Sequence, residues 1–182
     1  MHGDSQEPRS LIGRRGLYED GYKEAADTLV DSVQGGQQQH WILYPIIFLY
    51  RHWLELTLKG LITYAHHTKQ HWQPGEREKK LKDLASYHDL GALWGELKSF
   101  LAGVRLDLSL DTTIAFDFLV KEFAAYDERG QAFRYPVNTR DVQTLQQPDV
   151  IDLPNLKFTV AAMSNYLGVV HEAIAQHLDP DI

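Results

Sequence analysis

The stretch PIIFLYRHWLELTLKGLITYAHHT, residues 45–68, decides the fold of this chain. Plotted at about 100° per residue, its apolar side chains fall on nearly every side of a helix. Proline suits a first helical turn, so the helix is predicted to begin at Tyr44 or Pro45. At about 1.5 Å per residue it would be about 37 Å long, enough to cross a small domain. A helix that is apolar all round is a buried helix, and this one is predicted to be the central strut.

Four further helices are predicted from apolar side chains that recur every three or four residues. They are expected at residues 17–34, 88–102, 111–129 and 152–178. Asp89 is expected near the positive end of the second of these, where a carboxylate is favourable. Asp111 or Thr112 is expected to cap the third, and Asp152 the last.

The segments between these helices are predicted to be loops. Residues 35–39 contain two helix-breaking glycines, and residues 70–83 are rich in charge and breakers. Residues 133–136, Phe-Arg-Tyr-Pro, are the one extended piece, because proline pushes the preceding residue out of the helical region. The prediction is an all-α, five-helix bundle with a structured loop between helices four and five. At 182 residues it fits one domain, residues 17–182, after a flexible N-terminal tail, residues 1–16.

Composition excludes several classes of function. The chain has no cysteine, so disulfides, thiol catalysis and thiolate metal sites are impossible. Its 18 Lys and Arg residues against 25 Asp and Glu residues give a net charge of −7, which argues against general DNA binding. It shows neither a secretory signal nor an apolar run long enough for a membrane span, so we expect no membrane association and a cytoplasmic protein.

The central helix carries charged side chains within its apolar surroundings. Arg51, Glu55 and Lys59 are spaced four residues apart and therefore share one face. Burying ionised groups is costly unless they are paired and hydrogen-bonded, so these residues need partners elsewhere in the chain. Arg134 is expected to meet Glu55 or Asp127 in a two-pronged contact. His88 is expected to approach Arg51 or Glu55.

Two interpretations of this cluster stay open. It is either an internal ion network that fixes how the helices pack, or a cleft in which Arg51, Lys59 and Arg134 hold an anion. In the second case His52 or His88 would transfer protons, since histidine titrates near neutral pH. Arg51, His52 and His88 are then the candidate catalytic residues.

Other polar groups favour structure over chemistry. His66, His67 and His71 lie near the end of a helix without a carboxylate at matching spacing, so we expect them to be solvated and expect no metal site. Residues 76–82 alternate in charge and are typical of a solvated face; RNA docking there with Trp72 is the alternative. Trp53 and Trp94 fall on apolar helical positions and are predicted in the core. Common nucleotide, zinc-protease and esterase motifs do not occur, and we expect no cofactor.

Three short strings, in this order, resemble uncharacterised prokaryotic proteins of the HEPN superfamily. They are YRHWLELTLK at residues 50–59, His88-Asp89-Leu90 with Leu93-Trp94, and FRYP at residues 133–136. The resemblance covers residues 43–175. It implies a helical bundle that often dimerises, with relatives that include RNA-cleaving toxins, phage-defence components and partners of small nucleotidyltransferases. The residues that match are Arg51, His52, Glu55, Lys59, His88, Asp89 and Arg134, and the resemblance implies for them a shared polar cluster.

The nuclease pattern of that superfamily is missing. Its nuclease members carry an arginine followed by histidine after four to six residues, whereas Arg51 and His52 are adjacent and point about 100° apart on a helix. The resemblance therefore favours a homodimeric module that binds a nucleotide, RNA or a partner protein in a defence or toxin–antitoxin setting. An atypical metal-independent ribonuclease and a non-enzymatic adaptor are the alternatives, so the sequence leaves open whether the protein is an enzyme.

Overall fold

The computed structural model describes residues 9–33, 40–67, 75–103, 109–126 and 151–178, and these form an all-α structure without strands. The helices, in chain order, are α1 (Arg9–Ser32), α2 (His40–His67), α3 (Glu76–Ser86), α4 (Leu90–Gly103), α5 (Leu110–Tyr126) and α6 (Leu153–Leu178). The predicted fold class is thus confirmed. None of these helices has the length and apolar character that a membrane crossing requires.

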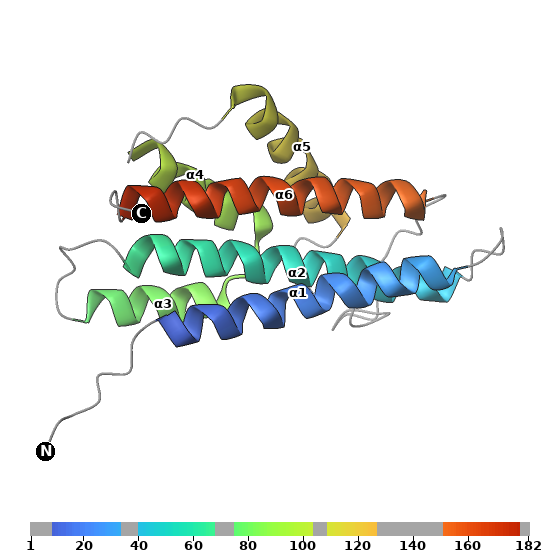
Figure 1. Cartoon of the computed structure of the whole chain (residues 1–182), viewed down its shortest axis with the longest axis horizontal. Coiled ribbons are helices and arrows are strands. Elements are labelled where there is room, and N and C mark those ends of the chain that lie inside the picture. Colours follow the sequence, from blue (N-terminus) through green and yellow to red (C-terminus); the bar gives the residue numbers. More distant parts are fainter. Residues whose placement is uncertain (1–8, 34–39, 68–74, 104–108, 127–150, 179–182) are drawn as a thin grey trace, which may run out of the picture.

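Helix α2 is the centre of the molecule, as its sequence predicts. It contacts α1, α3, α4 and α6, and Figure 1 shows it between α1 and α3 on one side and α6 on the other. Its apolar side chains line the core all along its length, with Ile46, Tyr50, Leu54 and Leu58 fully buried. Because water cannot reach these side chains, their burial supplies much of the drive to fold.

The ends of two helices follow the predicted capping chemistry. The Asp89 carboxylate accepts a hydrogen bond from the backbone N–H of Ala92 at 3.0 Å, at the start of α4. The Asp152 carboxylate accepts one from Asn155 N–H, also at 3.0 Å, at the start of α6. Each satisfies a donor that has no partner within its helix. Helix α5 begins at Leu110, so Asp111 and Thr112 lie inside its first turn and the predicted cap at these residues was wrong.

Other helix boundaries differ from the prediction. Helix α1 begins at Arg9, before the predicted start at residue 17, and α2 begins at His40 with Pro45 inside it. Pro45 cannot donate to the carbonyl four residues earlier, so the helix gives up one backbone bond there. Leu43, in the part of α2 before Pro45, is buried and extends the apolar face toward the N-terminus.

Helix α3 was not predicted, and the interpretation of residues 76–83 as a linker was wrong. Its sequence EREKKLKDLAS consists almost entirely of residues with good helix propensity, but it lacks a broad apolar stripe. Gly75 precedes it with φ of 80°, a left-handed conformation that suits glycine and turns the chain into the helix. Leu84 is buried and anchors α3 in the core. The predicted loop at 133–136 lies outside the described residues.

Candidate functional site

The carboxylate of Glu55 is the centre of a buried polar cluster. Glu55 is only 2% exposed on α2, one helical turn from both Arg51 and Lys59. Its Oε2 accepts a hydrogen bond from Arg51 Nη1 at 3.0 Å, and its Oε1 accepts one from Lys59 Nζ at 2.8 Å. His88 Nδ1 lies 2.8 Å from the same Oε1. Since an ionised carboxylate only accepts, Nδ1 is the protonated ring nitrogen. The predicted approach of His88 to Glu55 is confirmed.

Two further hydrogen bonds tie the cluster to the end of α3 and the connection to α4. Arg51 Nη2 donates to the carbonyl of His88 at 2.7 Å, and Lys59 Nζ donates to the carbonyl of Ala85 at 3.2 Å. Ala85 lies in the last turn of α3, where carbonyls lack helical partners and a cation is favourable. The cluster therefore holds α2 against residues 85–88.

The four side chains differ sharply in their access to solvent. Arg51 is 3% exposed, whereas the side chains of Lys59 and His88 are 14% and 44% exposed. Arg51 and Glu55 form the internal ion network that the sequence allowed. Lys59 and His88 form its accessible edge, which can meet a ligand.

The cluster also shifts the acidity of its carboxyl group. Burial raises the pKa of Glu55, but hydrogen bonds and positive charge from Lys59 and His88 outweigh burial and lower the pKa below its ordinary value. Glu55 is therefore ionised at neutral pH, and the cluster is a set of charges and not a set of neutral hydrogen bonds.

The remaining predicted site residues lie elsewhere. His52 packs in an aromatic group, edge-on to Tyr22 with centroids 4.6 Å apart and stacked on Phe48 at 5.6 Å. Asp89 caps α4 and makes none of the cluster bonds described above. Arg134 and its expected partner Asp127 lie outside the described residues.

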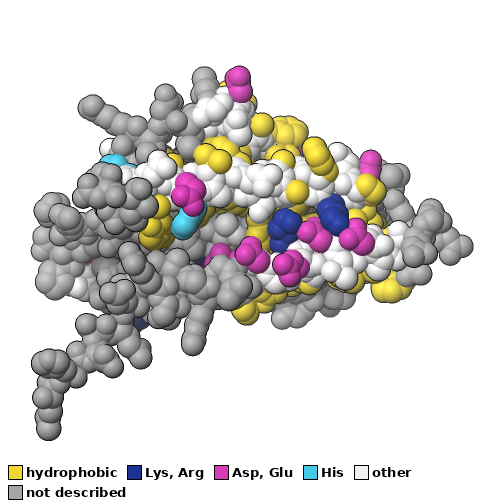
Figure 2. Space-filling view, viewed as in Figure 1, with side chains coloured by type: hydrophobic (Ala, Val, Ile, Leu, Met, Phe, Trp, Pro, Cys, Tyr) yellow, Lys and Arg dark blue, Asp and Glu magenta, His cyan; other side chains and the backbone are white. Residues whose placement is uncertain are grey.

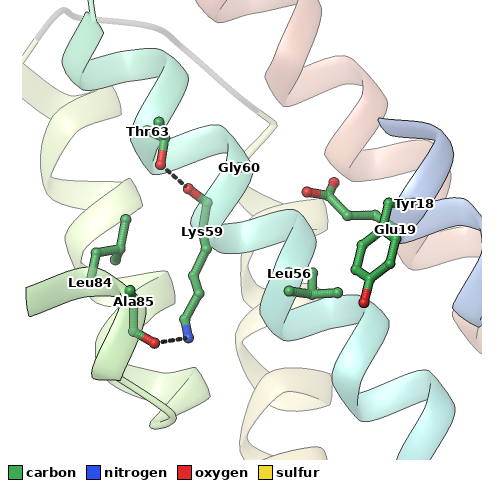
Figure 3. Close-up of a pocket in the computed structure, with 8 residues that line it drawn as sticks. All are labelled: Tyr18, Glu19, Leu56, Lys59, Gly60, Thr63, Leu84 and Ala85. Carbon is green, nitrogen blue, oxygen red and sulfur yellow. Dashed lines mark hydrogen bonds between the residues drawn. The ribbon is translucent and has the colours of Figure 1, made fainter. Parts of the chain in front are cut away.

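A pocket of about 380 Å³, which was not predicted from the sequence, lies next to Lys59. Figure 3 shows Lys59 in its wall and reaching toward α3. The lining side chains come from α1, α2 and α3: Tyr18, Glu19, Leu56, Lys59, Gly60, Thr63, Leu84 and Ala85. Because these residues are distant in sequence and α3 was not predicted, no spacing rule could have brought them together.

His66 is buried, contrary to the prediction that it is solvated. His66 is 7% exposed, and its Nε2 lies 2.8 Å from Glu96 Oε1, which Lys80 also contacts at 3.0 Å. His66, Lys80 and Glu96 thus join α2, α3 and α4. The side chain of His67, and His71, lie outside what the structure describes. Among the described residues, no three His, Asp or Glu side chains come together in the way a metal ion requires.

The face of the molecule in Figure 2 carries positive and negative side chains next to one another. On α1 and α6, Lys157 pairs with Asp31 at 2.6 Å and Lys23 pairs with Asp27 at 2.8 Å. Paired charges of this kind largely cancel at a distance. Such a face does not offer the continuous basic surface that a long nucleic acid needs.

Comparisons of the chain with protein-family models, curated proteins and solved structures give no match. The site must therefore be interpreted from its own chemistry.

Replacing Glu55 tests whether the cluster holds the fold. Glu55→Gln keeps the size of the side chain but removes its charge and turns an amide N–H₂ toward the donors of Arg51 or Lys59. We expect a loss of about 3–5 kcal/mol in the free energy of unfolding at pH 7, because the buried Arg51 loses its counter-charge. Urea unfolding measures this loss. Asp31→Asn, which breaks the exposed pair with Lys157, is the matched control and should cost less than about 1 kcal/mol.

The contribution of Glu55 to stability should also depend on pH, and comparing the wild type with Glu55→Gln measures this dependence. The pKa of Glu55 is lower in the folded than in the unfolded chain, so its stabilisation is complete above the ordinary value of 4.5 and disappears as the pH falls toward the lowered value. The difference in unfolding free energy between wild type and Glu55→Gln should therefore shrink as the pH falls below about 4.5. A difference that is constant down to the acid unfolding of the protein would contradict the assignment.

Proposed function

We propose that this chain is a HEPN-like cytoplasmic helical module that binds a nucleotide, either free or within RNA, at the edge formed by Lys59 and His88. It would act as a homodimer in a prokaryotic defence or toxin–antitoxin setting. The order of the three sequence strings supports the HEPN resemblance, and the all-α architecture around one buried helix agrees with it.

One observation carries the proposal: a lysine and a histidine, Lys59 and His88, lie together at the accessible edge of the cluster. Glu55 Oε1 lies 2.8 Å from both Lys59 Nζ and His88 Nδ1, so two donor groups at this edge converge on one carboxylate oxygen. Burial and pairing fix Arg51, so the cation that can meet a ligand is Lys59. A phosphate group is the anion that such a site favours, because lysine binds it as a compact point charge with three donors.

The surroundings favour a small ligand or a single nucleotide over a long duplex. The pocket beside Lys59 has about 380 Å³, within the range of small-molecule sites, about 300–1,000 Å³. The paired charges on α1 and α6 provide little attraction for a long polyanion.

Binding of nucleotides to three variants tests this proposal. Titration calorimetry with nucleoside monophosphates should show binding to the wild type and a loss of about tenfold or more in Lys59→Met, since a charge-assisted hydrogen bond to phosphate is removed. Lys59→Arg keeps the cation and should retain most of the affinity. Lys157→Met, which removes a lysine of α6, is the control.

Thermal unfolding confirms that each variant is folded. Repeating the titration with short single-stranded RNA shows whether the site prefers a free nucleotide or a nucleotide within RNA. Equal affinity of Lys59→Met and Lys157→Met, or no nucleotide binding by the wild type, would contradict the proposal.

The orientation of His88 favours ribonuclease activity as a second candidate. Its Nδ1–H donates to Glu55, which fixes the ring and leaves Nε2 able to accept a proton, as in other carboxylate–histidine pairs. Nε2 would take the proton of an RNA 2′-hydroxyl while the 2′-oxygen attacks the adjacent phosphorus and the 5′-oxygen leaves with a proton from water. Lys59, bound to the same carboxylate oxygen, would stabilise the phosphate charge. Arg51 and His52 have no such role in this scheme.

Incubation with an unstructured RNA in EDTA tests the second candidate. Cleavage that yields 2′,3′-cyclic phosphate ends should fall by about 10²-fold or more in His88→Ala, because a general base is lost. His171→Ala is the matched control, since its side chain is 43% exposed against 44% for His88. Equal cleavage by both variants, or no cleavage by the wild type, would contradict ribonuclease activity at His88. Nucleotide binding without catalysis would then be the remaining proposal.

If nucleotide binding also fails while Glu55→Gln unfolds the protein, the third alternative gains support. The chain would then be a non-enzymatic adaptor for a partner protein, and its cluster would serve the fold alone.

A further inference from the structure

The pocket beside Lys59 has a floor from α2 and walls from α1 and α3 (Figure 3). Leu56, Gly60 and Thr63 recur every three or four residues on α2 and therefore face the same side. Leu84 and Ala85 stand on α3, and Tyr18 and Glu19 on α1. The floor and the α3 wall are largely apolar, so polar recognition falls mainly to the two ionised side chains of the pocket.

The carboxylate of Glu19 lies directly over Gly60. A Cβ atom added to Gly60 would be 3.0 Å from Glu19 Oε1 and 3.4 Å from Oε2. Those distances are too short for an undisturbed contact, so the absence of a side chain at Gly60 lets the carboxylate sit at the pocket floor. Glu19 therefore presents an acceptor toward the groove from the α1 side.

The ammonium group of Lys59 lies on the α3 side of the same pocket. Its bonds to Glu55 Oε1 at 2.8 Å and to the Ala85 carbonyl at 3.2 Å hold it in place. An ammonium group has three donors, and these two bonds leave one for a ligand. The pocket thus offers a hydrogen-bond acceptor on one side and a donor on the other, with an apolar floor between them.

We propose that this pocket binds the base of the nucleotide and that it prefers guanine; this inference rests on the nucleotide binding proposed above. Guanine carries two donors, N1–H and the 2-amino group, on one edge, and two acceptors, O6 and N7, on another. The donor edge matches the Glu19 carboxylate on the α1 side, while the remaining donor of Lys59 holds the phosphate group of the same nucleotide. The flat ring fits against Leu56 and Leu84, and Tyr18, which is 63% exposed at the rim, supplies an aromatic face for stacking.

Three ligands separate base recognition from phosphate binding. GMP carries the complete guanine base, IMP lacks only the 2-amino group, and ribose 5-phosphate lacks the base. By calorimetry, the wild type should bind GMP about tenfold more tightly than IMP, because one hydrogen bond to Glu19 is lost in IMP. It should bind ribose 5-phosphate more weakly than either.

Two pairs of variants assign the preference to Glu19. Glu19→Gln should bring GMP and IMP within about twofold of each other, since its amide N–H₂ opposes the donors of guanine. Glu24→Gln, an exposed glutamate on the same helix, should keep the tenfold difference. Gly60→Ala should weaken GMP but not ribose 5-phosphate, because its Cβ displaces the Glu19 carboxylate. Gly95→Ala is its control, since a Cβ there meets nothing within 4 Å.

The outcomes distinguish this inference from the proposed function. Equal binding of GMP and IMP by the wild type, or a preference that survives in Glu19→Gln, overturns the guanine pocket even if ribose 5-phosphate binds at the Lys59 edge. Failure of all three ligands to bind overturns both proposals. Folding of the variants is not at risk, because Glu19 is only partly buried and alanine favours a helix over glycine.

Discussion

The ion pair between Arg51 and Glu55, buried inside the longest helix, is the constraint on which the rest of this structure depends. Two charges removed from water cost several kcal/mol each unless their hydrogen-bonding groups are satisfied. One pair does not satisfy them: Arg51 needs the His88 carbonyl, and Glu55 also accepts from Lys59 and His88. The chain must therefore bring residues 85–88 against the middle of α2, which fixes where α3 ends and α4 begins.

The accessible part of the cluster follows from the same constraint. Lys59 extends toward α3 because Glu55 and the Ala85 carbonyl both attract it, and in that position it lines the pocket between α1, α2 and α3. One lysine thus neutralises a buried carboxylate and offers a donor to a ligand. His88 has the same double character, with one ring nitrogen held by Glu55 on a side chain that is nearly half exposed. Lys59 and His88 therefore both hold the fold together and form the proposed binding edge.

Much of this arrangement could be predicted from local rules. Helical spacing placed Arg51, Glu55 and Lys59 on one face, the cost of burying charge required a partner, and His88 was a correct choice of partner. Asp89 and Asp152 cap helices because side-chain carboxylates satisfy the first N–H groups of a helix. These inferences succeeded because each depends on residues within one or two helical turns, or on one strong energetic requirement.

The rest depends on tertiary contacts that no local pattern encodes. Helix α3 has good helix propensity, but its sequence is mostly charged and lacks a broad apolar stripe, so its amphipathic signal is weak. His66 was expected in water because it lies near the end of a helix without a carboxylate at matching spacing, yet its Nε2 lies 2.8 Å from Glu96 of α4, which Lys80 of α3 also contacts. The pocket requires Glu19 to lie over Gly60, and these residues are on different helices. His52 and Arg51 are adjacent in sequence, but a helix turns them toward different neighbours.

A double-mutant cycle on Arg51 and Glu55 tests the central claim most directly. The free energy of unfolding is measured for the wild type, Arg51→Met, Glu55→Leu and the double variant. Each single change leaves one buried charge without its partner. The loss in unfolding free energy of the double variant should therefore be smaller than the sum of the two single losses, by at least about 2 kcal/mol. Losses that add to within about 0.5 kcal/mol would show that the two charges do not depend on each other and would contradict the account.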